Sequence, residues 1–332
     1  MGPVKTLLIS KDRRLVLRNA VGISIGLSLP SARPQDLYPS RTITIVVPFG
    51  PGGSGDLTAR TFARYLERRV GQSVVVENKP GANGIVGSQS VRQAAADGHS
   101  LLMVSNMTHA ANVHLYKKLP YDPLRDFEHA GIFGVFGVML LVPAGSPFKS
   151  MSELVKQARA KSEQFAIGHF NASTQVAAQL LAKAGNIPIR AVGYRTIGNA
   201  MTDVLGGHIH MVFADYPAAT AQLASGKFIP IAITESQRNS RWPDLPAISE
   251  YVPGFEMILS LGLATPAGTN RQVLDRINTW MAEAQKDGEV RSQLEKLGYT
   301  LRSLSVEGTR GFLKEESGRW ERYVRELQIE TQ

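Results

Sequence analysis

Short apolar runs alternate with longer amphipathic stretches along the chain from residue 41 to residue 327. Runs rich in β-branched residues predict strands, whereas apolar residues that recur once per helical turn predict helices. Because the two kinds of stretch alternate, the sequence predicts an α/β fold with mainly parallel sheets covered by helices. The predicted strands are 43–47, 73–77, 100–104, 136–142, 164–168, 189–193, 209–213, 229–233 and 257–264. The predicted helices are 57–70, 84–95, 151–161, 174–185, 198–205, 217–225, 270–287, 288–297 and 307–327.

The order of these elements predicts two lobes. Residues 41–135 and 145–255 form two similar α/β units, and the helices after residue 270 have no sheet of their own. We expect those helices to return to the first unit, so that the chain crosses between the units twice. The prediction is therefore a discontinuous lobe 1, residues 38–140 plus 259–332, and a lobe 2, residues 141–258, with a hinge and a cleft between them.

The first 37 residues predict an export signal. The basic segment Lys11-Asp12-Arg13-Arg14 precedes an apolar stretch, residues 20–29, and then Pro30-Ser31-Ala32, which is the order found in signal peptides. Arg13-Arg14-Leu15-Val16-Leu17 resembles a twin-arginine signal. The alternative is an amphipathic or disordered leader. We expect residues 1–37 to be a signal peptide with a short linker, and the mature protein to be periplasmic.

Charge and composition narrow the classes of partner. The formal net charge is +9, but residues 1–33 hold six basic residues and one acidic residue, so +5 of it belongs to the leader. The remaining charge is modest and dispersed, which predicts no nucleic-acid partner and mildly favours anionic ligands. The chain has no cysteine, so disulfides, thiolate metal sites and cysteine nucleophiles are excluded.

The most informative segment is the turn after the first predicted strand. Gly50-Pro51-Gly52-Gly53-Ser54-Gly55 follows that strand, and Asp56 is a good N-cap for the next helix. The unpaired amides and the dipole of a helix start favour an anion. The turn also satisfies G-x-G-x-x-G, with Glu77 where a ribose-binding acid would stand, so a nucleotide site, a small-anion site and an ordinary turn stay open. The alternative function is accordingly an exported nucleotide-dependent oxidoreductase.

Polar residues follow several other predicted strands, and their types suit a small carboxylate. Ser105, His109 and Asp215 could suggest a hydrolytic triad, but no Gly-x-Ser-x-Gly accompanies them. His208 and His210 have no carboxylate at a useful spacing, so we predict no metal site and no enzyme activity. The polar loops are 105–109, 169–175, 193–198 with Arg195, and 214–217.

The order and spacing of several motifs identify a family. They are Val47-Pro48-Phe49-Gly50-Pro51-Gly52-Gly53-Ser54-Gly55-Asp56, Val76-Glu77-Asn78-Lys79-Pro80-Gly81-Ala82-Asn83-Gly84, Ala96-Asp97-Gly98, Thr108-His109, and residues 115–123, 203–207 and 264–269. Across residues 38–327 the chain resembles the substrate-binding proteins of tripartite tricarboxylate transporters, the Bug-type periplasmic receptors. The resemblance implies a type II-like periplasmic-binding-protein fold with two crossover strands and Venus-flytrap closure. It also implies capture of a small organic carboxylate without a cofactor, by a monomer that serves membrane permease subunits or a sensor kinase.

The resemblance further implies a set of ligand-binding residues. Phe170 and Leu261 depart from the family pattern and make the far end of the pocket more apolar, so we expect a monocarboxylate or an aromatic acid rather than citrate. The sequence leaves open the identity of the carboxylate and of the permease. The implied site comprises Phe49, Gly53, Ser54, Gly55 and Asp56 on the first loop, Ser105, Thr108 and His109 on the floor, Asn171, Ala172, Ser173 and Thr174 on lobe 2, and Tyr194 and Asp215 at the far end.

Overall fold

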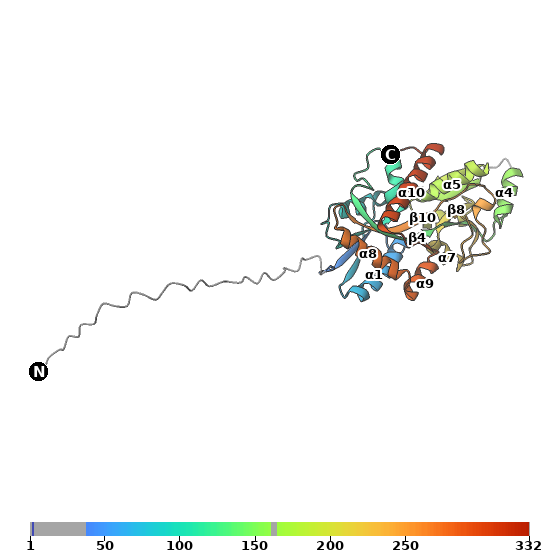
Figure 1. The fold of residues 1–332 in the computed structure, drawn as a ribbon. Coiled ribbons are helices and arrows are strands. Elements are labelled where there is room, and N and C mark those ends of the chain that lie inside the picture. The colour runs from blue at the N-terminus through green and yellow to red at the C-terminus, as the bar shows by residue number, and fades with distance from the viewer. Residues whose placement is uncertain (1, 3–37, 161–164, 332) are drawn as a thin grey trace. The chain divides into compact units, whose positions relative to one another are not determined.

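The computed structural model describes residues 2, 38–160 and 165–331. The predicted signal peptide, residues 1–37, lies outside the described residues except for residue 2. Residues 37–332 form one compact unit. It contains two β-sheets flanked by helices, arranged as two α/β lobes (Figure 1). Among the residues described, no helix has both the length and the apolar character needed to cross a membrane.

The sheet of lobe 1 is built around the strands predicted first. Ile45 and Val47 of β1 pack on one face with Phe62 of α1, while Val46 packs on the other face with Ile85 of α2. Both faces are therefore buried, which explains the continuous apolar run in β1. In the described part of the chain the strand order is β11 (Thr300–Leu301), β4 (Phe127–Phe136), β10 (Leu259–Pro266), β3 (Ser100–Ser105), β1 (Ile43–Val47) and β2 (Val74–Asn78). The helices around it are α1 (Ser54–Val70), α2 (Ile85–Arg92), α8 (Arg271–Ala284), α9 (Gly288–Lys296) and α10 (Val306–Glu326), with η2 (Ala82–Gly84), η3 (Met107–Ala111) and α3 (Asn112–Leu115).

The sheet of lobe 2 is also covered on both faces. Alternate residues of β8 illustrate this, because Met211 and Phe213 pack in the cluster that contains α4 and α5, whereas Val212 packs in the cluster that contains α6 and α7. The strand order is β7 (Ile189–Gly193), β6 (Phe165–His169), β8 (Met211–Asp215), β5 (Val138–Pro143) and β9 (Phe228–Ile233). The helices are α4 (Met151–Ala160), α5 (Ala172–Gly185), α6 (Ile197–Leu205) and α7 (Tyr216–Leu223), with η4 (Ile248–Glu250) before the return to lobe 1.

The two lobes are joined by two crossings that are hydrogen-bonded to each other. β4 of lobe 1 continues into β5 of lobe 2 with only Gly137 between them. Thr234, on the return path, accepts a hydrogen bond at Oγ1 from Val138 N at 2.9 Å and donates from the same hydroxyl to Met257 O at 2.7 Å. Met257 N in turn donates to Thr234 O at 2.8 Å. Bending between the lobes must therefore act on both crossings together.

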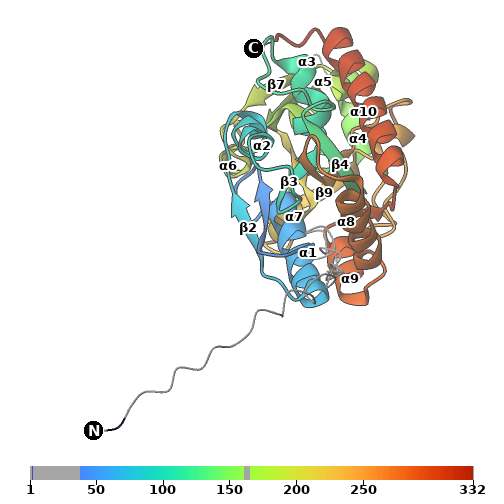
Figure 2. The same cartoon turned by 60° about the vertical axis from the view of Figure 1, so that its left-hand side comes forward.

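Helix α10 braces the return crossing. Arg319 donates to the carboxylate of Glu256 at 2.8 Å, and the hydroxyl of Tyr323 donates to Glu256 O at 2.7 Å. Trp320, which is 1% exposed, lies in one buried cluster with Phe255 beside the crossing. In Figure 2 the helix runs from beside α8 toward α5, and Lys183 of α5 bonds to its last turn. The C-terminal helices were predicted to return to lobe 1. Helix α10 also makes contacts with lobe 2.

Several boundaries differ from the predictions. The sheets are mixed rather than mainly parallel, because β10 and β5, which continue from the crossings, enter their sheets antiparallel to the neighbouring strands. The predicted strand 136–142 is two strands, and β4 begins at Phe127. Gly134 of β4 has a φ of +147° and lies where the β4–β10 register shifts, which explains a glycine within this strand. Helix α1 begins at Ser54 with Gly53 as N-cap, so Asp56 lies within the first turn.

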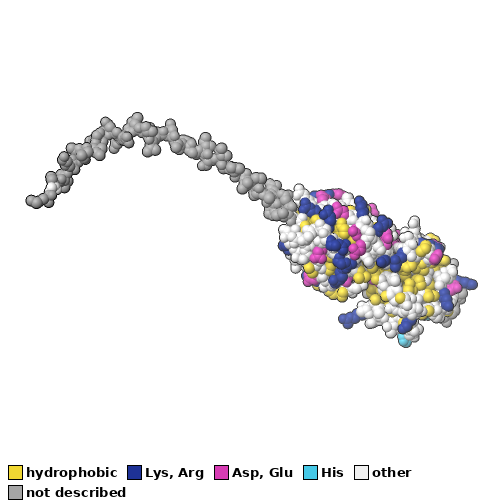
Figure 3. Space-filling view, turned by 90° about the horizontal axis from the view of Figure 1, so that it is seen from below, with side chains coloured by type: hydrophobic (Ala, Val, Ile, Leu, Met, Phe, Trp, Pro, Cys, Tyr) yellow, Lys and Arg dark blue, Asp and Glu magenta, His cyan; other side chains and the backbone are white. Residues whose placement is uncertain are grey.

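Charged side chains of both signs are interspersed on the lobe 1 part of the surface seen in Figure 3. Ion pairs join charged side chains of lobe 1, for example Arg68 with Glu289 at 3.1 Å and Arg291 with Glu295 at 2.8 Å. On this face, basic residues are therefore not gathered into the single-sign stripe that a nucleic-acid surface presents.

Candidate functional site

A cavity of about 930 Å³ lies where the loops of the two lobes meet. Its lobe 1 side consists of residues between 48 and 55, of residues 80–84, 105–107 and 259–261, and of Phe136. Its lobe 2 side consists of Phe170, Asn171, Ser173, residues 195–197 and Asp215. Most of this lining comes from loops that follow the carboxyl ends of β1, β2, β3, β6, β7 and β8 and precede helices, which is where α/β folds place their ligands; residues 259–261 and Phe136 belong to β10 and β4.

The first turn of α1 forms one wall. Gly53, Ser54 and Gly55 line the cavity, and the first amides of a helix have no intrahelical partners. Ser54 is 8% exposed, and its Oγ has no hydrogen-bond partner within the described residues. Asp56 is buried and does not line the cavity. Its side chain instead holds the turn, because its carboxylate accepts from Gly52 N at 2.9 Å and from Arg60 at 3.0 Å.

The charge of Asp56 is stabilised in this position. Burial by itself raises the pKa of Asp56, but hydrogen bonds from Arg60, the Gly52 amide and Asn78 outweigh that effect and lower it. Asp56 therefore stays ionised and bonded to Arg60. It holds the turn and is not in the cavity lining, although the resemblance implied a ligand-binding residue.

The floor is formed by Ser105, Asn106 and Met107. Asn106 is 2% exposed, and its Nδ2 is a buried donor with no partner among the described residues. The sequence reasoning did not select Asn106, although it stands inside the polar run 105–109 that was noted. Asn106 lines the cavity, and a buried amide without a partner indicates a ligand contact, since such groups are otherwise satisfied.

Thr108 and His109 do not line the cavity, contrary to the prediction. The π-helical turn η3 directs them into the core. Thr108 is fully buried and bonds to Ser105, and His109 is 1% exposed with its ring 5.0 Å from Phe127 and 5.2 Å from His129. Thr108 and His109 therefore lie directly behind the residues that form the cavity floor.

On lobe 2, the start of α5 presents Phe170, Asn171 and Ser173 to the cavity. Asn171 is the N-cap, and its Oδ1 accepts from Thr174 N at 2.9 Å. Thr174 completes the capping box and is 1% exposed, so it supports the loop without lining the cavity. Ala172, between them, does not line the cavity either.

The far end of the cavity contains one of the two predicted residues. Asp215 lines it and caps α7, accepting from Ala218 N at 3.0 Å. Burial raises the pKa of Asp215, although the Ala218 amide opposes this. Tyr194 does not line the cavity, because its hydroxyl donates to Asp203 at 2.8 Å. Arg195, which is exposed, and Thr196 occupy the position expected for Tyr194.

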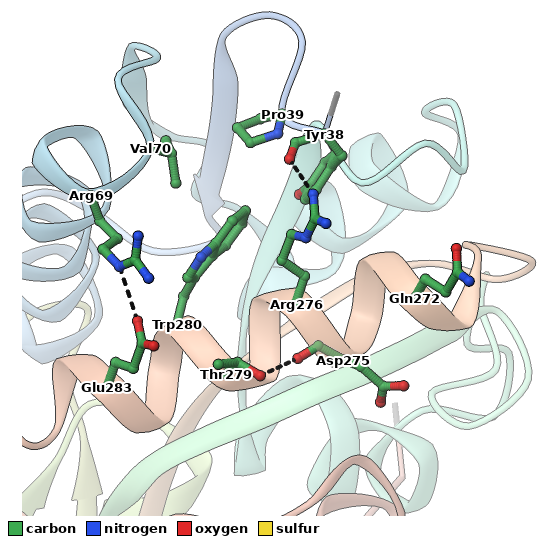
Figure 4. A pocket seen from close by; sticks show the side chains of 10 residues that line it. All are labelled: Tyr38, Pro39, Arg69, Val70, Gln272, Asp275, Arg276, Thr279, Trp280 and Glu283. Carbon is green, nitrogen blue, oxygen red and sulfur yellow. Dashed lines mark hydrogen bonds and ion pairs between the residues drawn. The ribbon is translucent and has the colours of Figure 1, made fainter. Parts of the chain in front are cut away.

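A second, shallower cavity of about 630 Å³ lies on the surface of lobe 1 (Figure 4). Trp280 and Tyr38 stack at its base with ring centroids 5.6 Å apart. Its charged groups are already engaged, since Arg69 pairs with Glu283 at 3.1 Å and Arg276 donates to Tyr38 O at 2.7 Å. This arrangement leaves the interlobe cavity as the better candidate for a ligand site.

Two α/β lobes joined by paired crossings, with helix starts around a cavity between them, define a solute-binding protein. More specifically, the chain belongs to the tripartite tricarboxylate transporter family receptors, whose family model matches residues 58–329. The resemblance stated from the motifs is thereby confirmed.

Relatives extend over nearly the whole chain. A "UPF0065 protein in tcbD-tcbE intergenic region" of Pseudomonas sp. strain P51 is 32% identical, over 96% of this chain and 95% of its own length. "Protein BugT" of Bordetella pertussis is 30% identical, over 92% and 95%. Among solved structures, "R. palustris Rpa4515 with adipate" has a TM-score of 0.82 at 27% identity, covering 89% of this chain and all of that one. "MatC (Rpa3494) from Rhodopseudomonas palustris with bound malate" has a TM-score of 0.75 at 29% identity, covering 86% and 100%.

Proposed function

We propose that the protein is a periplasmic receptor that captures a small organic carboxylate in the interlobe cavity and delivers it to the permease of a tripartite transporter. One observation carries the proposal. Ser54 Oγ and Asn106 Nδ2 are buried polar atoms without partners among the described residues, and both residues line the cavity. With the free amides of α1, they offer a carboxylate a set of donors that no residue of the described chain uses.

The lobe 2 side supplies complementary groups. Asn171 and Ser173 lie at the start of α5, so their helix also presents its positive end to the cavity. In the proposed closed state the carboxylate lies between the starts of α1 and α5. Asp215, whose pKa is raised by burial, then faces the remainder of the ligand and can accept from a hydroxyl or an amine.

The lining favours a ligand with an apolar body. Phe49, Phe136, Phe170, Leu259 and Leu261 contribute aromatic and aliphatic surface to the cavity. Among the described residues that line the cavity, Arg195 is the only one that is a lysine or an arginine. A tricarboxylate would bring more negative charge than this set can balance, so we propose a monocarboxylate or an aromatic acid in preference to citrate.

The organisation of the chain fits this function. We propose that lobe 1 comprises residues 38–140 plus 259–332, that lobe 2 comprises residues 141–258, and that closure bends the paired crossings at Gly137 and Met257. Residues 1–37 are proposed to direct export by the twin-arginine route, which Arg13 and Arg14 suggest. The receptor is proposed to act as a monomer and to present its closed shape to permease subunits; a sensor kinase is the other candidate partner.

Thermal unfolding of the mature protein with benzoate, adipate, malate and citrate tests the proposal. A ligand at a hundredfold excess over its Kd adds roughly 2.7 kcal/mol, which raises the Tm of a protein of this size by about 4 °C. We expect the largest shift with benzoate or another monocarboxylate. A shift with citrate or malate alone would refute the ligand preference. A shift with NAD⁺ and none with any carboxylate would instead support the oxidoreductase alternative based on the turn of residues 50–55.

A further inference from the structure

We propose that His109 is a positioning residue that acts through Thr108 to hold the Ser105 hydroxyl as a hydrogen-bond donor to the bound carboxylate. The inference rests on the proposed function, because it concerns the polarity of a group that lines the same cavity. His109 itself lies behind the floor and does not line the cavity.

The hydrogen bonds around Thr108 can be accounted for completely. Thr108 Oγ1 donates to Ser105 O at 3.2 Å and accepts from Ser105 N at 3.1 Å. Its third close contact is His109 Nδ1, at 2.9 Å. A hydroxyl has one hydrogen to donate and two lone pairs to accept with. If His109 Nδ1 carries a proton, all three contacts form at once, with the threonine hydrogen going to Ser105 O. A bare Nδ1 would compete with Ser105 O for that one hydrogen, so the geometry favours the Nδ1–H tautomer.

The surroundings of the ring favour the same tautomer. Nε2 of His109 is buried and has no hydrogen-bond partner in the described part of the chain. A proton on Nε2 would leave a buried donor unsatisfied, and orphaned buried N–H groups are rare in proteins. Burial, and then the neighbouring His129, hold the pKa of His109 well below its usual value, so the ring is neutral and has only one proton to place. That proton belongs on Nδ1.

The tautomer of His109 determines which group the Ser105 hydroxyl can donate to. With the lone pairs of Thr108 Oγ1 filled by Ser105 N and His109 Nδ1, the Ser105 hydroxyl cannot donate to Thr108, although the two oxygens are 3.3 Å apart. Ser105 Oγ already accepts from Thr108 N at 3.2 Å. Its hydrogen is therefore left for the cavity, where a carboxylate oxygen can accept it. Without a donor at position 109, the same hydrogen would turn to the vacated lone pair of Thr108.

The tautomer can be measured directly and without a ligand. Long-range ¹H–¹⁵N correlation spectra of the mature protein labelled with ¹⁵N-histidine distinguish Nδ1–H from Nε2–H rings. The chain has seven histidines, and the signal of His109 is identified as the one missing from the His109→Asn variant. We expect His109 to be neutral with its proton on Nδ1. An Nε2–H or doubly protonated ring at neutral pH overturns the inference.

Coupling to Ser105 is the second test, measured by calorimetry with benzoate, adipate and malate as probes. Ser105→Ala and His109→Leu should each weaken the same probe by about tenfold, and the double variant should bind no more weakly than Ser105→Ala. His109→Asn, which restores a donor near the Nδ1 position, should recover affinity. His129→Leu is the matched control for packing: it should lower the Tm without changing affinity.

Additive losses in the double variant would show that His109 acts independently of Ser105 and would overturn the inference. If none of the probes binds the unaltered protein, the proposed function fails, and the tautomer measurement still decides the state of His109.

Discussion

Glu316 should make the stability of this protein depend on pH in a way that one substitution removes. The side chain lies in α10, the residue is 1% exposed, and its carboxylate is 3.3 Å from Arg319. Burial raises the pKa of Glu316 to about 7 from an ordinary value of 4.5, and Arg319 only partly opposes this. The folded protein therefore holds this proton more tightly than the unfolded chain does.

The sign and size of the effect follow by linkage. Because the folded-state pKa is raised, the free energy of unfolding falls as the pH rises from about 4.5 to about 7 and is then level. At roughly 1.4 kcal/mol per unit of pKa, the full effect is about 3 kcal/mol, of which about 2.5 kcal/mol develops between pH 5 and pH 8. Glu316→Gln is neutral at every pH, so its gain in stability over the unaltered protein should grow by that amount across this range.

Urea unfolding followed by tryptophan fluorescence at pH 5 and pH 8 measures this difference. Glu315→Gln is the matched control, since it removes the same charge from an exposed position on the same helix. Its effect should be the same at both pH values within about 0.5 kcal/mol. If the effect of Glu316→Gln is equally independent of pH, the carboxylate is ionised in the folded protein at pH 5 and the reasoning is wrong.

Three further substitutions test the hinge and the site. Gly298→Ala places a Cβ 2.1 Å from Tyr216 at a φ of +84°, whereas Gly268→Ala has a φ of +82° and open space. Urea unfolding should show that Gly298→Ala lowers the free energy of unfolding by at least about 2 kcal/mol more than Gly268→Ala does. Equal losses would contradict the contact with Tyr216. Thr234→Val removes the hydroxyl bonds that join the crossings and should cost about 2 kcal/mol in the same assay, with no change if those bonds are dispensable. Asn106→Asp replaces a buried donor by an acceptor, so calorimetry with benzoate should show affinity at least about tenfold weaker, and undiminished binding would exclude Asn106 from the site.

The candidate site shows how far sequence reasoning extends. The turn at residues 53–55, Ser105, Asn171, Ser173 and Asp215 were predicted and do line one cavity. They were found because polar residues and glycines follow strands and precede helices, which is a local pattern. Whether a carboxylate binds there is still a prediction.

Other residues of the same loops were misplaced, and the reason is geometric. Thr108 and His109 have the chemistry of a binding site, but the π-helical turn points them into the core. Tyr194 turns to Asp203 instead of the cavity. Asn106, two residues before Thr108 in the same polar run, has its buried amide at the floor. The direction of a side chain in such loops depends on a backbone turn that residue types alone do not specify.

The sequence by itself determined the family, the alternation of strands and helices, and the anion-favouring turn. Each of these depends on the short-range spacing of apolar residues, glycines and helix-capping residues. Only the tertiary structure decided that β4 is a strand despite its glycines, that the crossings make the sheets mixed, and that His109 stands behind Ser105. Those features depend on contacts between residues far apart in the chain, such as the pairing of Leu261 with Gly134, and on the register that packing selects among locally acceptable conformations.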